Sequence, residues 1–212
     1  NNVSFYADAE LNASKAWLLD AAVRFENYSD FGSVATFKFA TRYKVAKDFN
    51  LRGSVSTGFR APSLQQINFS NTLTSFSGGM LVQSRIARNG DAITKSAGIP
   101  DLKEETSVNG SIGFAWKPVA GLTITVDGYM VKVKDRIVLS GLFDKDDATL
   151  PAAFTSQLSA INVQTAQFFA NSVNTTNFGL DMVIDYNKKI GANTFKAMFA
   201  GNIQKMKVDK VK

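Results

Sequence analysis

The chain has 212 residues, an apolar fraction of 45% and a net charge of +6, a size and composition that fit one or two ordinary domains. It contains neither cysteine nor histidine, which excludes disulfide frameworks, thiolate and histidine metal sites, and catalysis by Ser-His-Asp or Cys-His groups. An enzyme would have to use carboxylates, Lys or Tyr, and no catalytic pair of these stands out, so we expect no catalytic residue, metal or cofactor.

The basic residues form no patch, so we expect them on polar faces and turns and expect no nucleic-acid partner. The other use of the positive charge would be to hold anionic ligands or lipopolysaccharide phosphates. The most apolar stretch, 16–23, is interrupted by Asp20, which excludes a spanning helix. The first residues lack a basic start with an apolar core and already alternate like a strand, so we expect an export signal upstream.

Along the chain, apolar and polar residues alternate with a period of two in segment after segment. In 16–26, for example, Trp17, Leu19 and Val23 lie on one side, with Asp20 and Arg24 on the other. The segments are 3–11, 16–26, 34–45, 51–60, 106–117, 122–135, 177–187 and 194–204. This period, over about ten residues, is typical of tilted strands that cross a bilayer with one face toward lipid. We therefore predict an all-β, antiparallel up-and-down meander of about eight long strands.

Segment 122–135 fits this pattern least well. Its apolar side, which begins at Leu122 and Ile124, continues into Lys132 and Lys134. We expect its later half to leave the membrane or to contain a bulge.

The connections between these segments alternate between short and long. Those at 12–15, 46–50, 117–121 and 188–193 are short, whereas 27–33, 60–105 and 140–176 are longer. Soluble domains rarely carry such long irregular loops, but outer-membrane barrels have short periplasmic turns and long outer loops. We predict a single partial barrel domain, 1–212, with extracellular loops at 60–105 and 140–176.

Four large amphipathic aromatic residues lie on the apolar side near short turns, namely Trp17, Tyr43, Trp116 and Tyr186. In an up-and-down wall they would lie at one height, as a girdle at the headgroup level. A soluble β-sandwich would also alternate but has no reason to place these residues at one level. The pattern thus favours a transmembrane barrel.

The polar side carries charges of both signs, which would face the barrel lumen. These residues are Asp20, Arg24, Glu26, Arg42, Arg52, Asp127, Asp181 and Asp185. Charges in a confined interior must be paired or hydrated. A folded element filling the lumen and an open, water-filled pore would both satisfy them.

Two features of the loops suggest further structure. The acidic run at 144–147 resembles a calcium loop, but Thr149 and Thr155 stand where glycine and the bidentate glutamate are required, so we favour a solvated loop. Segment 150–162 is predicted to form a short amphipathic helix with Phe154, Leu158 and Ile161 on one side. That side would pack on its own loop, or else cap the entrance over a ligand; we favour the first.

A string at the end of segment 51–60 resembles a signature of TonB-dependent outer-membrane receptors. It reads Gly58-Phe59-Arg60-Ala61-Pro62-Ser63-Leu64. The stretches 24–32, 102–107 and 129–137 resemble further family motifs and follow in the family's order. The residues of these motifs are most similar to those of Bacteroidetes-type receptors. Physically, Pro62 must end the strand and Gly58 allows a close approach or bend, so the string would shape the wall and loop base.

The resemblance implies a 22-stranded transmembrane β-barrel filled by an N-terminal plug, which imports a scarce nutrient with energy relayed by TonB. The ligand, a siderophore, haem, cobalamin or glycan, would be captured by loops 60–105 and 140–176. This sequence shows no plug, TonB box or closing strand, so we expect a barrel segment in outer-membrane lipid. An isolated fragment would self-associate through its open edges and apolar face. A passive porin or surface adhesin is the alternative.

Overall fold

The computed structural model describes residues 1–29 and 32–211 and divides into two compact units. The sheet unit consists of Asn1–Phe59, Thr106–Lys134 and Asn174–Asp209, and the second unit of Arg60–Glu105, Asp135–Val173 and Lys210–Lys212. Asp30 and Phe31, which belong to the predicted connection 27–33 and to one family-like stretch, lie outside the described residues.

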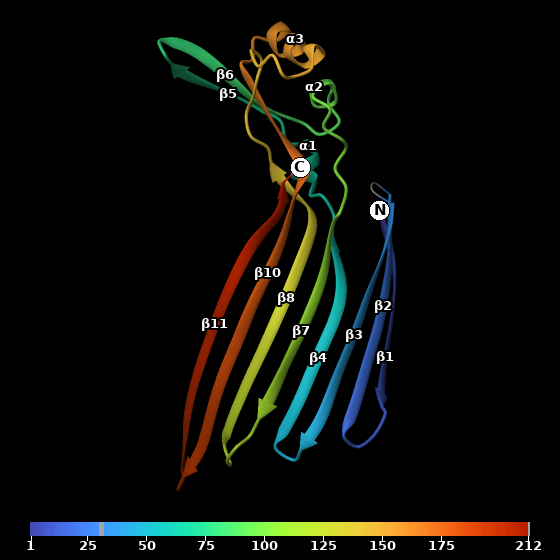
Figure 1. Cartoon of the computed structure of the whole chain (residues 1–212), viewed down its shortest axis with the longest axis vertical. Helices are drawn as coiled ribbons and strands as arrows, with labels where there is room; N and C mark the ends of the chain where they lie inside the picture. The colour runs from blue at the N-terminus through green and yellow to red at the C-terminus, as the bar shows by residue number, and fades with distance from the viewer. Residues whose placement is uncertain (30–31, 212) are drawn as a thin grey trace. The chain divides into compact units, whose positions relative to one another are not determined.

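Eight long strands run through the sheet unit, in the order β1-β2-β3-β4-β7-β8-β10-β11 (Figure 1). They are β1 (Asn2–Asn12), β2 (Trp17–Tyr28), β3 (Gly32–Ala46), β4 (Phe49–Arg60), β7 (Glu105–Trp116), β8 (Leu122–Leu139), β10 (Thr165–Ile190) and β11 (Asn193–Val211). The predicted antiparallel meander is therefore confirmed. The largest difference is β10, which begins at Thr165 and not near 177.

The register keeps the apolar residues of neighbouring strands on one face. Phe5 lies opposite Phe25, and Trp17 lies opposite Tyr43. Because side chains alternate between faces, a slip of one residue would move every apolar side chain to the other face. This apolar face has no partner within the sheet unit: Phe5 is 66% exposed and Ile112 is 73% exposed. It requires an apolar environment outside the chain.

The short turns lie together at one end of the sheet unit. They join β1 to β2, β3 to β4, β7 to β8 and β10 to β11 (Figure 1). Gly121 and Gly191 lie in two of them with φ of 85° and 62°, a backbone conformation that favours glycine. The connections from β4 to β7 and from β8 to β10 instead lead into the second unit. Two of the three connections predicted to be longer, 60–105 and 140–176, therefore agree with the sequence pattern. The third, 27–33, is wrong: β2 extends to Tyr28 and β3 begins at Gly32, so this connection is as short as the turns.

Two glycines allow side chains to meet across an intervening strand. Gly113 of β7 lies opposite Asp127 of β8, and Asp127 reaches over it to form a bidentate ion pair with Arg52 of β4. Gly179 of β10 similarly leaves room for the ring of Tyr129, whose hydroxyl lies 3.3 Å from Asn202 Nδ2 on β11. A Cβ atom would lie 2.7 Å from Asp127 Cγ at the first glycine.

We expect Gly113→Ala to destabilise the barrel by about 1–3 kcal/mol, the usual cost of overpacking. The added methyl group would overlap the Asp127 carboxylate and the backbone oxygen of Val126. Gly110→Ala on the same strand is the matched control, because nothing lies within 4 Å of its added Cβ. Urea unfolding of the refolded receptor measures both variants, and equal midpoints for the two would contradict the prediction.

The second unit is more regular than the long irregular loops predicted at 60–105 and 140–176, which is a correction. Its other elements are α1 (Leu64–Asn68), β5 (Asn71–Ser77), β6 (Met80–Ala87), α2 (Ala92–Ser96), β9 (Phe143–Asp144) and α3 (Ala152–Ala160). β5 and β6 form a hairpin around Gly78 and Gly79, which both have positive φ. β6 then pairs in parallel with Thr165–Phe168 at the start of β10. This pairing explains why β10 begins early.

A small hydrophobic core holds the second unit together. It contains Ala87, Ile93, Phe154, Leu158, Val163, Ala166 and Phe168. Phe154 and Leu158 of α3 are fully buried, whereas Ile161, just beyond the helix, is 39% exposed. The helix predicted at 150–162 is thus present. It packs on Val163, Ala166 and Phe168 of its own loop, as we favoured, and also on Ala87 and Ile93 of 60–105. None of the helices in the described residues is long and apolar enough to cross a membrane.

Candidate functional site

The family-like string at 58–64 forms the passage from β4 into α1. β4 ends at Arg60, two residues before Pro62, which is buried and has no backbone N–H for a ladder bond. Ser63 then caps α1: its hydroxyl accepts a bond from the Gln66 amide at 3.1 Å, and the Gln66 side chain accepts from the Ser63 amide at 3.0 Å. This reciprocal capping box fixes where the helix starts.

At Gly58, within the sheet unit, an added Cβ atom would lie 2.8 Å from Ser107 Oγ on the neighbouring strand β7. The close approach inferred from the sequence is therefore present here. A larger residue would require Ser107 to move.

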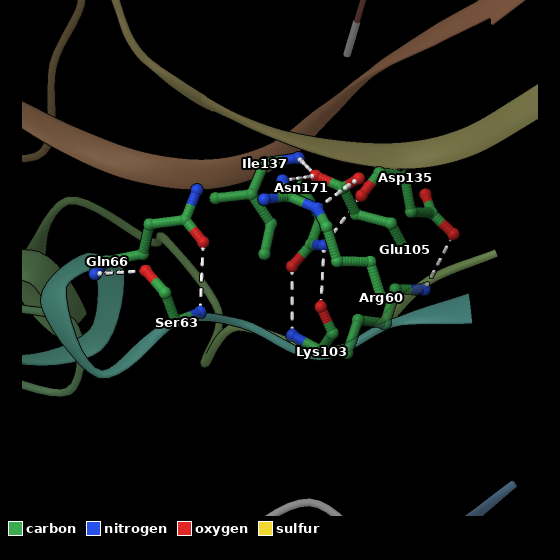
Figure 2. A network of polar contacts seen from close by, with 8 residues as sticks. All are labelled: Arg60, Ser63, Gln66, Lys103, Glu105, Asp135, Ile137 and Asn171. Carbon is green, nitrogen blue, oxygen red and sulfur yellow. Dashed lines mark hydrogen bonds and ion pairs between the residues drawn. The ribbon is translucent and has the colours of Figure 1, made fainter.

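Arg60 and Glu105 form the centre of a polar network in the second unit (Figure 2). Arg60 Nε donates to Glu105 Oε2 at 3.0 Å, and its Nη2 pairs with Oε1, which gives a bidentate ion pair. Glu105 Oε1 also accepts the backbone N–H of Ile137 at 2.7 Å. Glu105 is 6% exposed, whereas the Arg60 side chain is 57% exposed. One buried carboxylate thus joins three segments of the second unit.

The charged state of Glu105 is favoured by its partners. Glu105 is the first residue of β7 and belongs to the second unit. Burial raises the pKa of Glu105, but the bonds from Arg60 and from the Ile137 amide outweigh it and hold the pKa below its ordinary value. Glu105 is therefore an ionised anchor at neutral pH.

Asn171 adds a second junction to this network (Figure 2). Its side chain accepts the Lys103 amide at 2.9 Å and donates to the carbonyl oxygens of Lys103 at 2.9 Å and Asp135 at 2.7 Å. Lys103 Nζ pairs with Asp135 Oδ2 at 3.1 Å. Asp135 has a φ of 55°. The bulge offered as one possibility for the later half of 122–135 is not seen within 124–134, where the pairing with β7 runs without a register shift.

Together the two junctions join residues near both ends of two segments of the second unit, Arg60–Glu105 and Asp135–Val173. Residue 60 and residue 105 bound the first excursion of the chain, and residues 135 and 173 bound the second. The network holds these two segments together within the second unit, using residues 60, 103–105, 135–137 and 171. Sequence reasoning singled out Arg60 but missed Asn171. It quoted Glu105 only as part of the family-like stretch 102–107.

A pocket of about 420 Å³ lies beside this network. Arg60, Ser63, Gln65, Gln66, Phe69 and Phe169 line it. A half-exposed guanidinium, two amide side chains and two aromatic rings would suit a ligand with both polar groups and a flat apolar part. The pocket is the part of the described second unit that we consider for ligand contact.

The acidic run at 144–147 is held by hydrogen bonds from within its own loop. Gln164 Nε2 donates to Asp144 at 2.8 Å and to Asp146 at 2.9 Å, and Asp147 accepts the amide and hydroxyl of Thr149. The pKa of Asp146 is lowered first by the bond from Lys145 and then by that from Gln164. Among the described residues, no group of acidic side chains is arranged to hold a metal ion.

Several charges on the polar face of the sheet unit are paired with each other. Lys38 pairs with Asp20 at 2.9 Å, Arg24 with Glu26 at 2.7 Å, and Arg52 with Asp127. Asp181 accepts a bond from Asn202. The predicted polar face thus contains partners for its own charges, which agrees with both a filled and a water-filled lumen.

The four aromatic residues of the predicted girdle lie at the short-turn end of the sheet unit. Trp17 and Tyr43 are cross-strand partners with ring centroids 6.4 Å apart. Trp116 immediately precedes Lys117, whose amide donates to Asp48 in the β3–β4 turn, and Tyr186 precedes Asn187, whose amide donates to Gly121 in the β7–β8 turn. Trp116 and Tyr186 are therefore each followed by a residue whose backbone amide is hydrogen-bonded to a neighbouring turn.

Long antiparallel strands with one apolar and one charged face, joined by short turns at one end, define a segment of an outer-membrane β-barrel wall. Residues 1–204 match the family model described as TonB dependent receptor-like, beta-barrel. The chain therefore belongs to the family of TonB-dependent receptors, which are proteins of the bacterial outer membrane, and it is a segment of their barrel domain.

Known proteins resemble the chain in sequence over a short part and in fold over nearly all of it. The vitamin B12 transporter BtuB of Vibrio cholerae serotype O1 is 36% identical over 50 residues, which are 24% of this chain and 8% of that protein. The siderophore receptor PirA from Pseudomonas aeruginosa has a TM-score of 0.65 at 14% identity, covering 96% of this chain and 34% of that one. The RagAB peptide transporter has a TM-score of 0.67 at 16% identity, covering 99% of this chain and 22% of that one.

The chain thus spans only a minor part of each of these proteins, at most 34% of the solved structures named. The structural likenesses, at these identities, concern the fold alone.

Proposed function

We propose that this chain is part of the wall of an active importer that takes up a scarce nutrient across the outer membrane. The single observation that carries the proposal is the family match over residues 1–204. The named relatives are a vitamin B12 transporter, a siderophore receptor and a peptide transporter. The ligand class accordingly includes a siderophore, haem, cobalamin, a glycan or a peptide. The steps are binding and gating, without bond chemistry in this chain.

In this proposal the predicted loops 60–105 and 140–176 are extracellular and capture the ligand. The packed core of the second unit supports this role, because it gives the ligand-contacting residues a rigid base. The half-exposed guanidinium of Arg60 and the rings of Phe69 and Phe169 would contact the ligand. The Arg60–Glu105–Asn171 network would hold the base of both excursions in place while the ligand binds.

The string Gly58–Leu64 would then have a structural role at the junction of wall and loop. Pro62 ends the strand, Ser63 starts α1, and Arg60 anchors the loop base through Glu105. Transport would require an N-terminal plug in the lumen and energy from the TonB system, both supplied by the whole protein. The charges of the polar face would then face the plug or lumen water.

The short-turn end would lie at the periplasmic headgroups, with Trp17, Tyr43, Trp116 and Tyr186 as its aromatic girdle. The apolar bodies and polar edges of such rings suit this level. We expect a spin label at position 17 or 116 of the full-length receptor to report headgroup depth, and one at position 112 to report the hydrocarbon interior. A label at position 17 that reports the bilayer centre would contradict the girdle.

Growth experiments test the proposed import. A strain that lacks the receptor is grown with a single source of iron, cobalamin, glycan or peptide. We expect it to fail on one source and to recover with the full-length gene, but only while TonB is present. Recovery in a strain without TonB would instead indicate a passive porin. Normal growth of the deletion strain on every source, with loss of surface attachment, would indicate an adhesin.

A further inference from the structure

The apolar face of the sheet unit carries lysines at the end opposite the short turns. On β8, Lys132 lies opposite Val108 and Lys134 lies opposite Thr106, both on the apolar face of β7. The two lysines line a depression of about 260 Å³ together with Phe37 and Val108 of that face. Both are exposed. They are charged groups among side chains that face lipid.

Two further lysines of β11 lie at the same level. Tyr129 of β8 contacts Asn202 of β11 across Gly179, and both strands run antiparallel to β10 between them. Lys132 and Lys134 come three and five residues after Tyr129 on β8. Lys205 and Lys207 come three and five residues after Asn202 on β11. Odd offsets move from the polar face, where Tyr129 and Asn202 lie, to the apolar face. The four lysines therefore form two rows, about 10 Å apart, on that face.

The distance from these lysines to the aromatic end matches the height of an apolar membrane band. On β8, Ile124 lies opposite Trp116, and Lys134 comes ten residues later. On β11, Phe195 contacts the ring of Tyr186, and Lys205 also comes ten residues later. Ten residues at about 3.3 Å each, tilted by about 40°, rise about 25 Å, the usual height of the lipid-facing apolar band.

Among the residues that the structure describes, one ion pair involves this lysine cluster (Lys132, Lys134, Lys205 and Lys207), that of Lys207 with Asp209. Asp209 lies 3.9 Å from Lys207 Nζ and accepts the Thr176 hydroxyl at 2.5 Å. One carboxylate beside four ammonium groups leaves a net positive patch. A lysine on the lipid side of a barrel is strongly destabilising at mid-bilayer and nearly neutral at the interface. The cluster therefore belongs at the headgroup level.

We propose that this lysine cluster binds the phosphate groups of anionic lipid headgroups in the leaflet at this end of the wall. Phosphates are the anions found at that depth, and each ammonium group donates up to three hydrogen bonds to phosphate oxygens. The long lysine stems pack along neighbouring apolar side chains while their charged ends reach the headgroups. If the proposed orientation of the loops is correct, this is the outer leaflet.

The test uses the full-length receptor in detergent micelles, titrated with bis-phosphorylated lipid A and with lipid A from which the phosphates have been removed. We expect K132Q/K134Q/K205Q/K207Q to weaken binding of the phosphorylated lipid at least about tenfold and to leave the dephosphorylated lipid unchanged. The matched control replaces Lys15, Lys44, Lys47 and Lys117, near the short turns, by glutamine and should change binding less than about twofold. Replacing the four cluster lysines by arginine should retain binding.

Two further measurements keep the test decisive. Amine labelling of the wild-type receptor should show that lipid A protects the four cluster lysines and leaves Lys15 and Lys47 reactive, which needs no variant to fold. Binding within about twofold of wild type in the quadruple glutamine variant, or absence of protection, would overturn the proposal. Displacement of lipid A by millimolar inorganic phosphate would show that the cluster is a site for free phosphate, and the proposal that it binds a lipid headgroup would be wrong.

Discussion

Phe154→Ala is expected to lower the free energy that protects the second unit from opening by about 3–5 kcal/mol, the usual cost of removing a buried phenylalanine. Phe154 is fully buried on α3 and contacts two other rings, with centroid distances of 6.2 Å to Phe143 and 5.9 Å to Phe168. The core of this unit contains few large side chains, so its neighbours cannot refill the cavity. Hydrogen exchange of the backbone amides in 152–168 of the full-length receptor measures the loss.

Phe76→Ala is the matched control for that experiment. Phe76 lies on β5 of the same unit but is 73% exposed, so the same truncation should change stability by less than about 0.5 kcal/mol. Amides of the sheet unit provide an internal reference in both variants. Equal protection in the two variants would mean that α3 does not hold the unit together.

The sheet could be predicted from sequence because one physical constraint acts on every strand. In a barrel wall with lipid on one side, apolar and polar residues must alternate along every strand. Segments 3–11 and 106–117 show this period of two, which can be recognised before the partner strands are known. The first part of β10 does not face lipid. There Ala166 and Phe168 are buried in the core while the strand pairs with β6 in parallel and with β9. Without lipid on one face the alternation disappears, and 165–176 was predicted as loop.

The polar network was only partly predictable, for a different reason. Pro62 and Ser63 act on their immediate neighbours, so the end of β4 and the start of α1 follow from local chemistry. The partner of Arg60 lies 45 residues away, and Asn171 lies 68 residues from Lys103. No local rule joins such positions, and a single sequence offers no pairing signal between them.

Glu105→Gln is expected to destabilise the second unit by about 1–3 kcal/mol, because the neutral glutamine has one acceptor oxygen where the carboxylate has two, and its NH2 group would face the donors of Arg60 or Ile137. The cost stays modest because Arg60 is half exposed and water can solvate its guanidinium. Glu104→Gln removes the same charge one residue away and serves as the control. The opening free energy from hydrogen exchange at 60–69 and 135–137 measures both.

The effect of Glu105 should also depend on pH in one direction. Its pKa in the folded protein lies below 4.5, its ordinary value, so the folded state favours the ionised form. The stabilisation is complete above that ordinary value and is lost as the pH falls through the lower folded value. The stability difference between wild type and Glu105→Gln should therefore be constant near neutral pH and shrink in acid. A difference that grows as the pH falls would show that Glu105 is neutral in the folded protein, and the ion pair would then not anchor the loop base.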